Sequence, residues 1–361
     1  MKLTRFDPNM ATRHAPADGM TWHSPAEAPF RLTGFPWFEQ NHLYRRLPLK
    51  PTLPLPESVD NLAWHTAGGQ VAFKTDSTRI AIKVNLRSTD LFDHMPPTGR
   101  RGFDLYRGKP GHTQYVSTTR FKAPAKAYDA SLLKLDKPKV DNYTINFPLY
   151  EGIKELWIGL DKGARLQVPP AFASPNPAVV YGTSITQGGC ASRPGMAYPN
   201  ILSRCLNRPI INLGFSGSAK LEPNVAHHMA AASSYPALLV IDADANCTAV
   251  LQKERLAPFI EILRQAHPRA PILVISRQPY AMDALSATYH KDRLLRARIQ
   301  EHTVRRLRKQ GDRHIHFLDG FTLIPEATFE ATVDGVHMTD LGFWQMADAL
   351  EPVFKRLLGN G

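Results

Sequence analysis

The sequence predicts an α/β protein of two domains, in which an all-β sandwich of jelly-roll type precedes a three-layer domain built on a parallel sheet. Up to about residue 160, apolar and polar side chains alternate, which is typical of strands. From Ala178 onward, short apolar runs alternate with segments long enough for helices, which is typical of a parallel sheet covered on both faces. A chain of 361 residues also fits two domains, at roughly 100–200 residues each.

The first domain is predicted from strand patterns. Residues 80–86 carry an apolar side chain at every second position, so four of them lie on one face of a strand. Shorter runs at 71–73, 144–147 and 156–160 have the same character. The dense prolines from Pro48 to Pro56 exclude a helix there. We therefore expect an antiparallel sandwich over residues 30–174, behind an N-terminal extension of residues 1–29.

The second domain, residues 175–361, is predicted from alternating strands and helices. The proline-rich link Ser174-Pro175-Asn176-Pro177 separates the two patterns. The expected strands are residues 178–181, 210–213, 238–241, 272–275 and 316–318, and the expected helices lie at 197–206, 225–232, 253–265, within 287–309 and at 341–357.

Composition excludes several classes of partner. The net charge of +12 suggests an acidic partner, but no nucleic-acid motif accompanies it, so we expect a solvated basic surface and no nucleic acid. No run of 18 apolar residues occurs, which argues against a membrane partner. Residues 1–20 contain no apolar core of a signal peptide, so the cytoplasm is the expected location, although a chain whose leader had been removed would look the same.

The three cysteines, Cys190, Cys205 and Cys247, are too few for a disulfide framework. One bridge and free buried thiols both remain open.

Polar residues follow three of the predicted strands, and a further pair lies late in the chain. Ser184 follows the first strand, Gly214 the second and Asn246 the third, while Asp334 and His337 precede the last helix. In open parallel sheets, ligands bind at the carboxyl ends of strands, so we expect these residues to converge.

The five residues together supply the parts that acyl transfer requires. Ser184 is a candidate nucleophile and His337 its base, because a serine hydroxyl needs a base within hydrogen-bond reach. Asp334, three residues earlier, can fix the imidazole tautomer. The backbone N–H groups of Ser184 and Gly214 and the side-chain amide of Asn246 are the candidate oxyanion hole. Each feature alone is most often a simple turn or surface group, and only the combination is informative.

This combination resembles the four sequence blocks of the SGNH/GDSL hydrolase family, in the family's order. The segment Tyr181–Tyr198 is similar to one bacterial subgroup, whose N-terminal sandwich carries a Gly-x-Asp-Leu-Tyr signature, present here as Gly102–Tyr106. Tyr44–Pro48 is also typical of that subgroup. The resemblance implies a flavodoxin-like catalytic domain, the triad and oxyanion roles given above, and no metal or organic cofactor.

Two positions depart from the family pattern. Thr183 stands where most members have aspartate before the nucleophile, a change that the subgroup tolerates. The third block reads Asp244-Ala245-Asn246-Cys247 in place of Gly-x-Asn-Asp, which leaves the support of Asn246 open; Asp244 is one candidate for that support.

By resemblance, the expected reaction is hydrolysis of an O-acyl ester, foremost an O-acetyl ester, of a carbohydrate through an acyl-Ser184 intermediate. The partner is then a small-molecule or glycan ester, and the oligomeric state stays open. One alternative is an esterase or thioesterase for lipid or small acyl esters, and another is a non-catalytic carbohydrate-binding protein. The substrate-binding candidates are four sandwich residues and one loop residue, although ordinary loop polarity would also explain them: His94, Arg101, Asp104, Tyr106 and Arg193.

Overall fold

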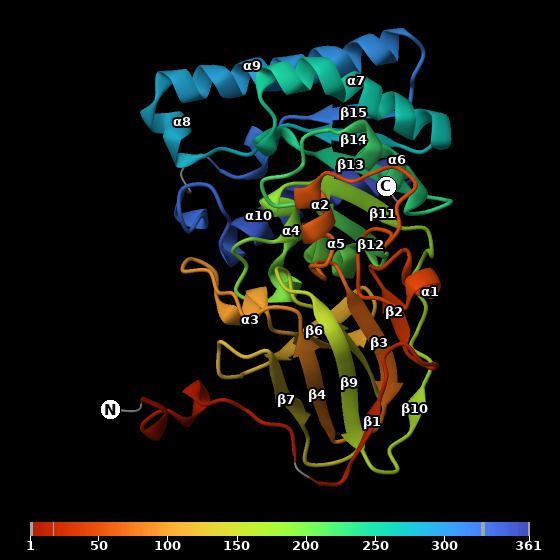
Figure 1. Cartoon of the computed structure of the whole chain (residues 1–361), viewed down its shortest axis with the longest axis vertical. Helices are drawn as coiled ribbons and strands as arrows, with labels where there is room; N and C mark the ends of the chain where they lie inside the picture. Colours follow the sequence, from red (N-terminus) through yellow and green to blue (C-terminus); the bar gives the residue numbers. More distant parts are fainter. Residues whose placement is uncertain (1–2, 17, 326–328, 360–361) are drawn as a thin grey trace.

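A computed structural model describes residues 3–16, 18–325 and 329–359. Figure 1 shows an antiparallel β-sandwich in its lower half and a parallel sheet with helices in its upper half. The predicted fold class, an α/β domain behind an all-β sandwich, is confirmed.

The sandwich consists of two antiparallel sheets around one apolar core. One sheet has the order β1 (Met20–His23), β9 (Ile153–Asp161), β4 (Arg79–Leu86), β7 (Ala127–Lys134). The other has the order β10 (Leu166–Gln167), β3 (Gln70–Thr75), β8 (Asp141–Asn146), β5 (Asp104–Lys109), β6 (His112–Thr118), with β2 (Arg31–Thr33) paired to β3. Phe73 and Ile145 from one sheet and Ile82 and Ile158 from the other are buried in the same cluster, as the period of two predicts.

The second domain has a five-stranded parallel sheet with the order β12 (Ile210–Gly214), β11 (Ala178–Gly182), β13 (Leu238–Asp242), β14 (Ile272–Ile275), β15 (Ile315–Leu318). This is the flavodoxin-like order, in which the chain reverses direction across the sheet at β11. The cores on the two faces show that α6 (Pro223–Ala231), α7 (Ala249–Ala266) and α9 (Ala287–Lys309) cover one face, and α5 (Tyr198–Leu206) and α10 (Asp340–Leu357) the other.

Five short α-helices and six 3₁₀ helices complete the described elements. The short α-helices are α1 (Phe38–Asn41), α2 (Glu57–Leu62), α3 (Pro97–Arg100), α4 (Ser184–Gln187) and α8 (Ala281–Leu285). Across the described residues, no helix is both long and apolar enough to span a bilayer.

Much of the segment between β2 and β3 packs on the second domain, although its Phe35, Phe38 and Tyr44 belong to the sandwich core. Its apolar side chains Trp37, Leu47, Val59 and Ala63 belong to the same buried cluster as the parallel strands and α7. Figure 1 shows α2 beside the upper domain, although the segment precedes most of the sandwich in the chain. The two domains are therefore interleaved in space.

Two expectations need correction. The boundary at residue 30 is wrong, because β1 pairs with β9 and so the sandwich begins at Met20. The basic residues do not all lie on the solvated surface that the net charge suggests, since Arg293 and Arg296 of α9 are buried. Arg296 is held there by an ion pair with Asp244, with 3.3 Å between Nη1 and Oδ1.

Candidate active site

Ser184, His337 and Asp334 form a continuous hydrogen-bonded chain. Ser184 Oγ lies 3.0 Å from His337 Nε2, and His337 Nδ1 lies 2.7 Å from Asp334 Oδ2. Asp334 Oδ1 also accepts the backbone N–H groups of Val336 and His337, so the carboxylate is fixed on its own loop. This is the geometry that a serine nucleophile, its base and an orienting carboxylate require.

Partial burial raises the pKa of Asp334, but the hydrogen bonds from the His337 ring and from the two backbone N–H groups outweigh it. The net pKa lies below the ordinary value for aspartate. Asp334 is therefore ionised at neutral pH and can stabilise an imidazolium on His337.

The nucleophile is placed by the turn from β11 into α4. Thr183 is the N-cap of α4, and its Oγ1 accepts the Ile185 N–H at 3.3 Å. Threonine in place of the more common aspartate thus still caps the helix. At Gly182 an added Cβ would lie 2.0 Å from Thr186 Oγ1, so only glycine allows this close approach.

Two of the three expected oxyanion donors are free to act. The Ser184 N–H donates no hydrogen bond among the described residues, since it is the first residue of α4. Asn246 Oδ1 accepts the Ala219 N–H at 3.3 Å, which leaves the side-chain NH₂ without a partner among those residues. Asn246 lies on a 3₁₀ turn, Asp244–Asn246, directly after β13.

The third expected donor needs correction. The Gly214 N–H donates to Asn212 Oδ1 at 2.8 Å and is packed under α4, where an added Cβ would lie 2.2 Å from the Gln187 nitrogen. The next glycine of the loop, Gly217, has φ of +67° and open space around its Cα, and its N–H has no partner among the described residues. We therefore assign the loop donor to Gly217.

Asp244 supports the Asn246 turn without contacting the Asn246 side chain. Its Oδ2 accepts the Arg277 N–H at 2.8 Å. Arg296 donates to the carbonyls of Asp244 and Cys247, at 2.9 and 2.8 Å, and so holds both ends of the turn.

Residues between β2 and β3 help to hold the catalytic loops in place. Arg46 is fully buried, and its guanidinium donates to the Gly214 carbonyl at 2.6 Å and the Asn212 carbonyl at 3.2 Å. Gln187 of α4 accepts the Ser216 N–H at 3.0 Å, and its amide nitrogen lies 2.9 Å from His65 Nδ1. Burial, with Arg46 and Arg100 nearby, lowers the pKa of His65 to about 3, so its ring stays neutral.

A cleft of about 150 Å³ opens beside the triad. It is lined from the second domain by Gly189, Cys190, Ser216 and His337, and from the sandwich domain by Phe92, His94, Met95 and Tyr150. The His94 and His337 rings meet edge to face, with 5.7 Å between centroids. Of the five substrate-binding candidates, the structure brings only His94 to the triad. The sequence reasoning missed the apolar lining residues because nothing in a strand-rich pattern marks them.

The other four candidates do not line this cleft, and their assignment as substrate contacts is corrected. Arg101 is fully buried and pairs with Glu151 at 3.3 Å. Asp104 is fully buried and accepts from Arg193, at 2.8 Å, and from the Gly195 N–H. Tyr106 is also buried, and its OH lies 2.6 Å from Arg193 Nη1. Asp104 and Tyr106 thus join the sandwich to the loop behind the nucleophile, whereas Arg101 is bound within the sandwich.

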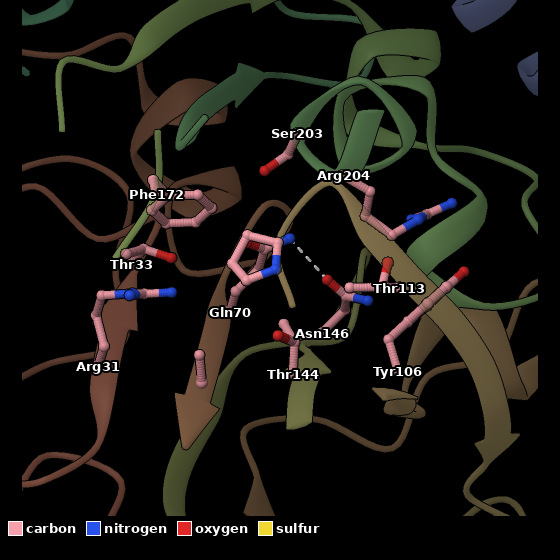
Figure 2. A pocket seen from close by; sticks show the side chains of 12 residues that line it. Arg31, Thr33, Gln70, Tyr106, Thr113, Thr144, Asn146, Phe172, Ser203 and Arg204 are labelled. Carbon is pink, nitrogen blue, oxygen red and sulfur yellow. Dashed lines mark hydrogen bonds between the residues drawn. The ribbon is translucent and has the colours of Figure 1, made fainter. Parts of the chain in front are cut away.

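A second pocket lies between the domains and is not a substrate site. Figure 2 shows Gln70 bonded to Asn146 on its floor, with Tyr106 and Arg204 on one side and Arg31 on the other. The free space there is only about 30 Å³, room for about one water molecule. Asn146 also donates to Asp104, so the pocket is a packing gap above the interdomain network.

The cysteines are all free thiols. Burial raises the pKa of both Cys190 and Cys247 to about 12, so both are protonated at neutral pH. Cys190 lines the cleft, and its N–H donates to the Met338 carbonyl at 3.1 Å.

Comparison with known protein families gives two matches. The family of GDSL-like lipases and acylhydrolases matches residues 175–355. The GxDLY family, the N-terminal domain of SGNH-hydrolase-type esterases, matches residues 20–166. A comparison with curated proteins gave no match.

Solved structures share the whole two-domain arrangement. A structure from Bacteroides ovatus, described as a GDSL-like lipase, is 27% identical, with 94% of this chain and 98% of that one covered and a TM-score of 0.86. A salicylyl-acyltransferase from a tetracycline biosynthetic pathway is 19% identical over 95% and 98% of the two chains, with a TM-score of 0.77. An acetyl xylan esterase from Butyrivibrio proteoclasticus is 12% identical over 95% and 99%, with a TM-score of 0.63.

Proposed function

This chain belongs to the family of GDSL-like lipases and acylhydrolases and is an ester hydrolase, and from this premise we propose that it removes short O-acyl groups, foremost O-acetyl, from a carbohydrate. The observation that carries the proposal is the small cleft beside the triad, with a histidine of the sandwich domain at its edge. Solved structures of this fold include a salicylyl-acyltransferase and an acetyl xylan esterase, so the fold alone does not specify the substrate. The shape of the cleft is therefore the basis for the proposed substrate.

In the proposed mechanism, Ser184 Oγ attacks the acyl carbon while His337 Nε2 takes its proton. The negative charge that develops on the carbonyl oxygen is held by the Ser184 and Gly217 N–H groups and by the Asn246 amide. His337 then protonates the leaving sugar oxygen, and the acyl group stays on Ser184. Water, activated by the same imidazole, releases the acid, with Asp334 stabilising the imidazolium in both steps.

The cleft favours a short acyl group. Its volume of about 150 Å³ corresponds to roughly five water molecules, at about 30 Å³ each. Phe92, Met95 and Tyr150 make much of the wall apolar, which suits a short acyl chain, and the cleft is too small to enclose a long one. This argues against the alternative of a lipid esterase.

We expect activity to fall with acyl length. On p-nitrophenyl esters, kcat/KM should be highest for acetate, lower for butyrate and lowest for octanoate, because the methylenes that the cleft cannot hold must be placed outside it. The alcohol is the same in the whole series, so it serves as its own control. Rising kcat/KM with chain length would instead support a lipid ester as substrate.

The role of His94 can be separated from that of the acyl cleft. His94→Ala should lower kcat/KM for an acetylated sugar by roughly 2–10-fold, the value of about one hydrogen bond. p-Nitrophenyl acetate, whose alcohol lacks sugar hydroxyls, should be hydrolysed at nearly the wild-type rate. His302→Ala, on the exposed side of α9, is the matched control. Equal losses on both esters would show that His94 acts on the triad and not on the sugar.

A further inference from the structure

We propose that His94, Cys190 and His337 form a binding site for a zinc-like divalent cation, and that the bound cation switches the hydrolase off. The cation is not a cofactor of the reaction, because it occupies the base that the reaction needs. This regulation is independent of the proposed substrate, and the binding of the cation can be tested whether or not that substrate is correct.

The three side chains already lie at the spacing that a metal site needs. Each side chain offers one ligand atom: a ring nitrogen from His94, a ring nitrogen from His337 and the sulfur of Cys190. These three atoms all lie within 4.8 Å of one another. Zn–N and Zn–S bonds of about 2.0–2.3 Å place tetrahedral ligands slightly closer together, so only small side-chain shifts are needed. Two imidazoles and one thiolate form a ligand set that binds zinc in preference to calcium or magnesium.

The surroundings of the cluster also suit a metal. His337 Nδ1 is bonded to Asp334 at 2.7 Å, and a metal-bound histidine usually donates its second N–H to such a carboxylate. The N–H of Cys190 donates to the carbonyl of Met338, the residue after His337, which ties the thiol to the loop of the base. His94 comes from the sandwich domain, so the site joins both domains.

Binding is a proton exchange with an inhibitory consequence. The Cys190 thiol loses its proton to bulk water and its sulfur lone pair forms the metal bond, since a coordinating thiol is deprotonated outright. The Nε2 lone pair of His337 also goes to the metal, so the Ser184 hydroxyl loses its acceptor. Ser184 is then no longer activated, and a fourth position remains for water or the serine oxygen.

Cobalt(II) is the probe of binding, because it reports thiolate ligation by its near-ultraviolet charge-transfer band and tetrahedral geometry by its visible bands. We expect the full-length, chelator-treated protein to show both on titration, and Zn²⁺ to abolish them by displacement. Cys205→Ser, which removes the exposed thiol, should behave as wild type. Cys190→Ser should lose the charge-transfer band.

Asp334→Asn tests the geometry, because the loss of a partner that orients a metal ligand costs about 10–100-fold in affinity. His94→Ala should also weaken Co²⁺ binding by at least about tenfold. Surface histidines that bind Co²⁺ elsewhere would give neither a thiolate band nor a dependence on Asp334.

The inhibition is measured on p-nitrophenyl acetate. Zn²⁺ should inhibit wild type and Cys205→Ser at the same concentration, and a chelator should restore their activity. For Cys190→Ser, the Zn²⁺ concentration that halves the variant's own metal-free rate should be at least about tenfold higher. Absence of a thiolate band in wild type, or its persistence in Cys190→Ser, overturns the metal site. Inactivity on every ester, with the cobalt bands present, would contradict the proposed function alone.

Discussion

Replacement of Ser184 by alanine should lower the rate of ester hydrolysis by about 10³-fold or more, because the nucleophile, base and orienting carboxylate act as a unit. Only the weak catalysis by the oxyanion donors and by substrate binding would then remain. The measurement is kcat on p-nitrophenyl acetate and on an acetylated sugar, with circular dichroism to show that the fold is retained.

Ser234→Ala is the matched control, since Ser234 is exposed on the loop that precedes β13, whereas Ser184 follows the carboxyl end of the neighbouring parallel strand β11. A fluorophosphonate probe adds a second readout, because it should label wild type and Ser234→Ala but not Ser184→Ala. A wild-type rate in Ser184→Ala would exclude the serine mechanism. A wild type without activity or labelling would favour a carbohydrate-binding protein.

Asn246→Ala should lower kcat by roughly 10²–10³-fold with little change in KM, the effect of one lost oxyanion donor. The physical reason is that the side-chain NH₂ of Asn246 has no partner among the described residues and is available to the substrate oxygen as its negative charge develops. The measurement is the separation of kcat from KM on p-nitrophenyl acetate.

A structural explanation of that loss can be tested with Asn246→Asp. The aspartate side chain would keep the shape and the oxygen that accepts the Ala219 N–H, but it would replace the donor by a negative charge. If Asn246 serves the oxyanion, the aspartate variant should be no faster than the alanine variant. Recovery of the wild-type rate would mean that the Ala219 contact alone matters, and an effect on KM alone would indicate ground-state binding.

Much of the fold could be predicted because the apolar patterns are local. The five short apolar runs that predicted the parallel strands all became strands, and the long helices follow the expected segments within a few residues. The polar-rich strands β5, β6 and β7 were not predicted, because alternation is a weak signal where few apolar residues point inward. The short helix α4 was also missed, since one turn has no periodicity of its own.

The candidate triad was predictable because each member stands in a short motif at a strand end or on one loop. The burial and pairing of Asp104, Arg101 and Arg193 could not be predicted, because they depend on partners far away in the chain. Asp104, for example, binds Arg193, which lies 89 positions later. A polar cluster in a sequence looks the same whether it is solvated, binds a ligand or pairs across an interface.

The sequence around Gly214 contains a local signal that its N–H is not a free donor. Asparagine side chains often bond to the backbone two residues on, and Asn212 stands two residues before Gly214. The Asn-Leu-Gly order therefore indicated that the Gly214 N–H is already used, and that the donor must come from later in the loop.

The packing of residues 37–63 bears on how such a protein can change over evolutionary time. The proline-rich link at residues 174–177 looks like a domain boundary at which recombination could join either half to a different partner. A hydrolase half inherited without Arg46 would leave the buried carbonyls of Asn212 and Gly214 without their donor. The side chains of Leu47 and Val59 would also be missing from its core. We therefore expect the two halves to be inherited as a pair, with new sandwich surfaces arising by substitution and not by exchange of modules.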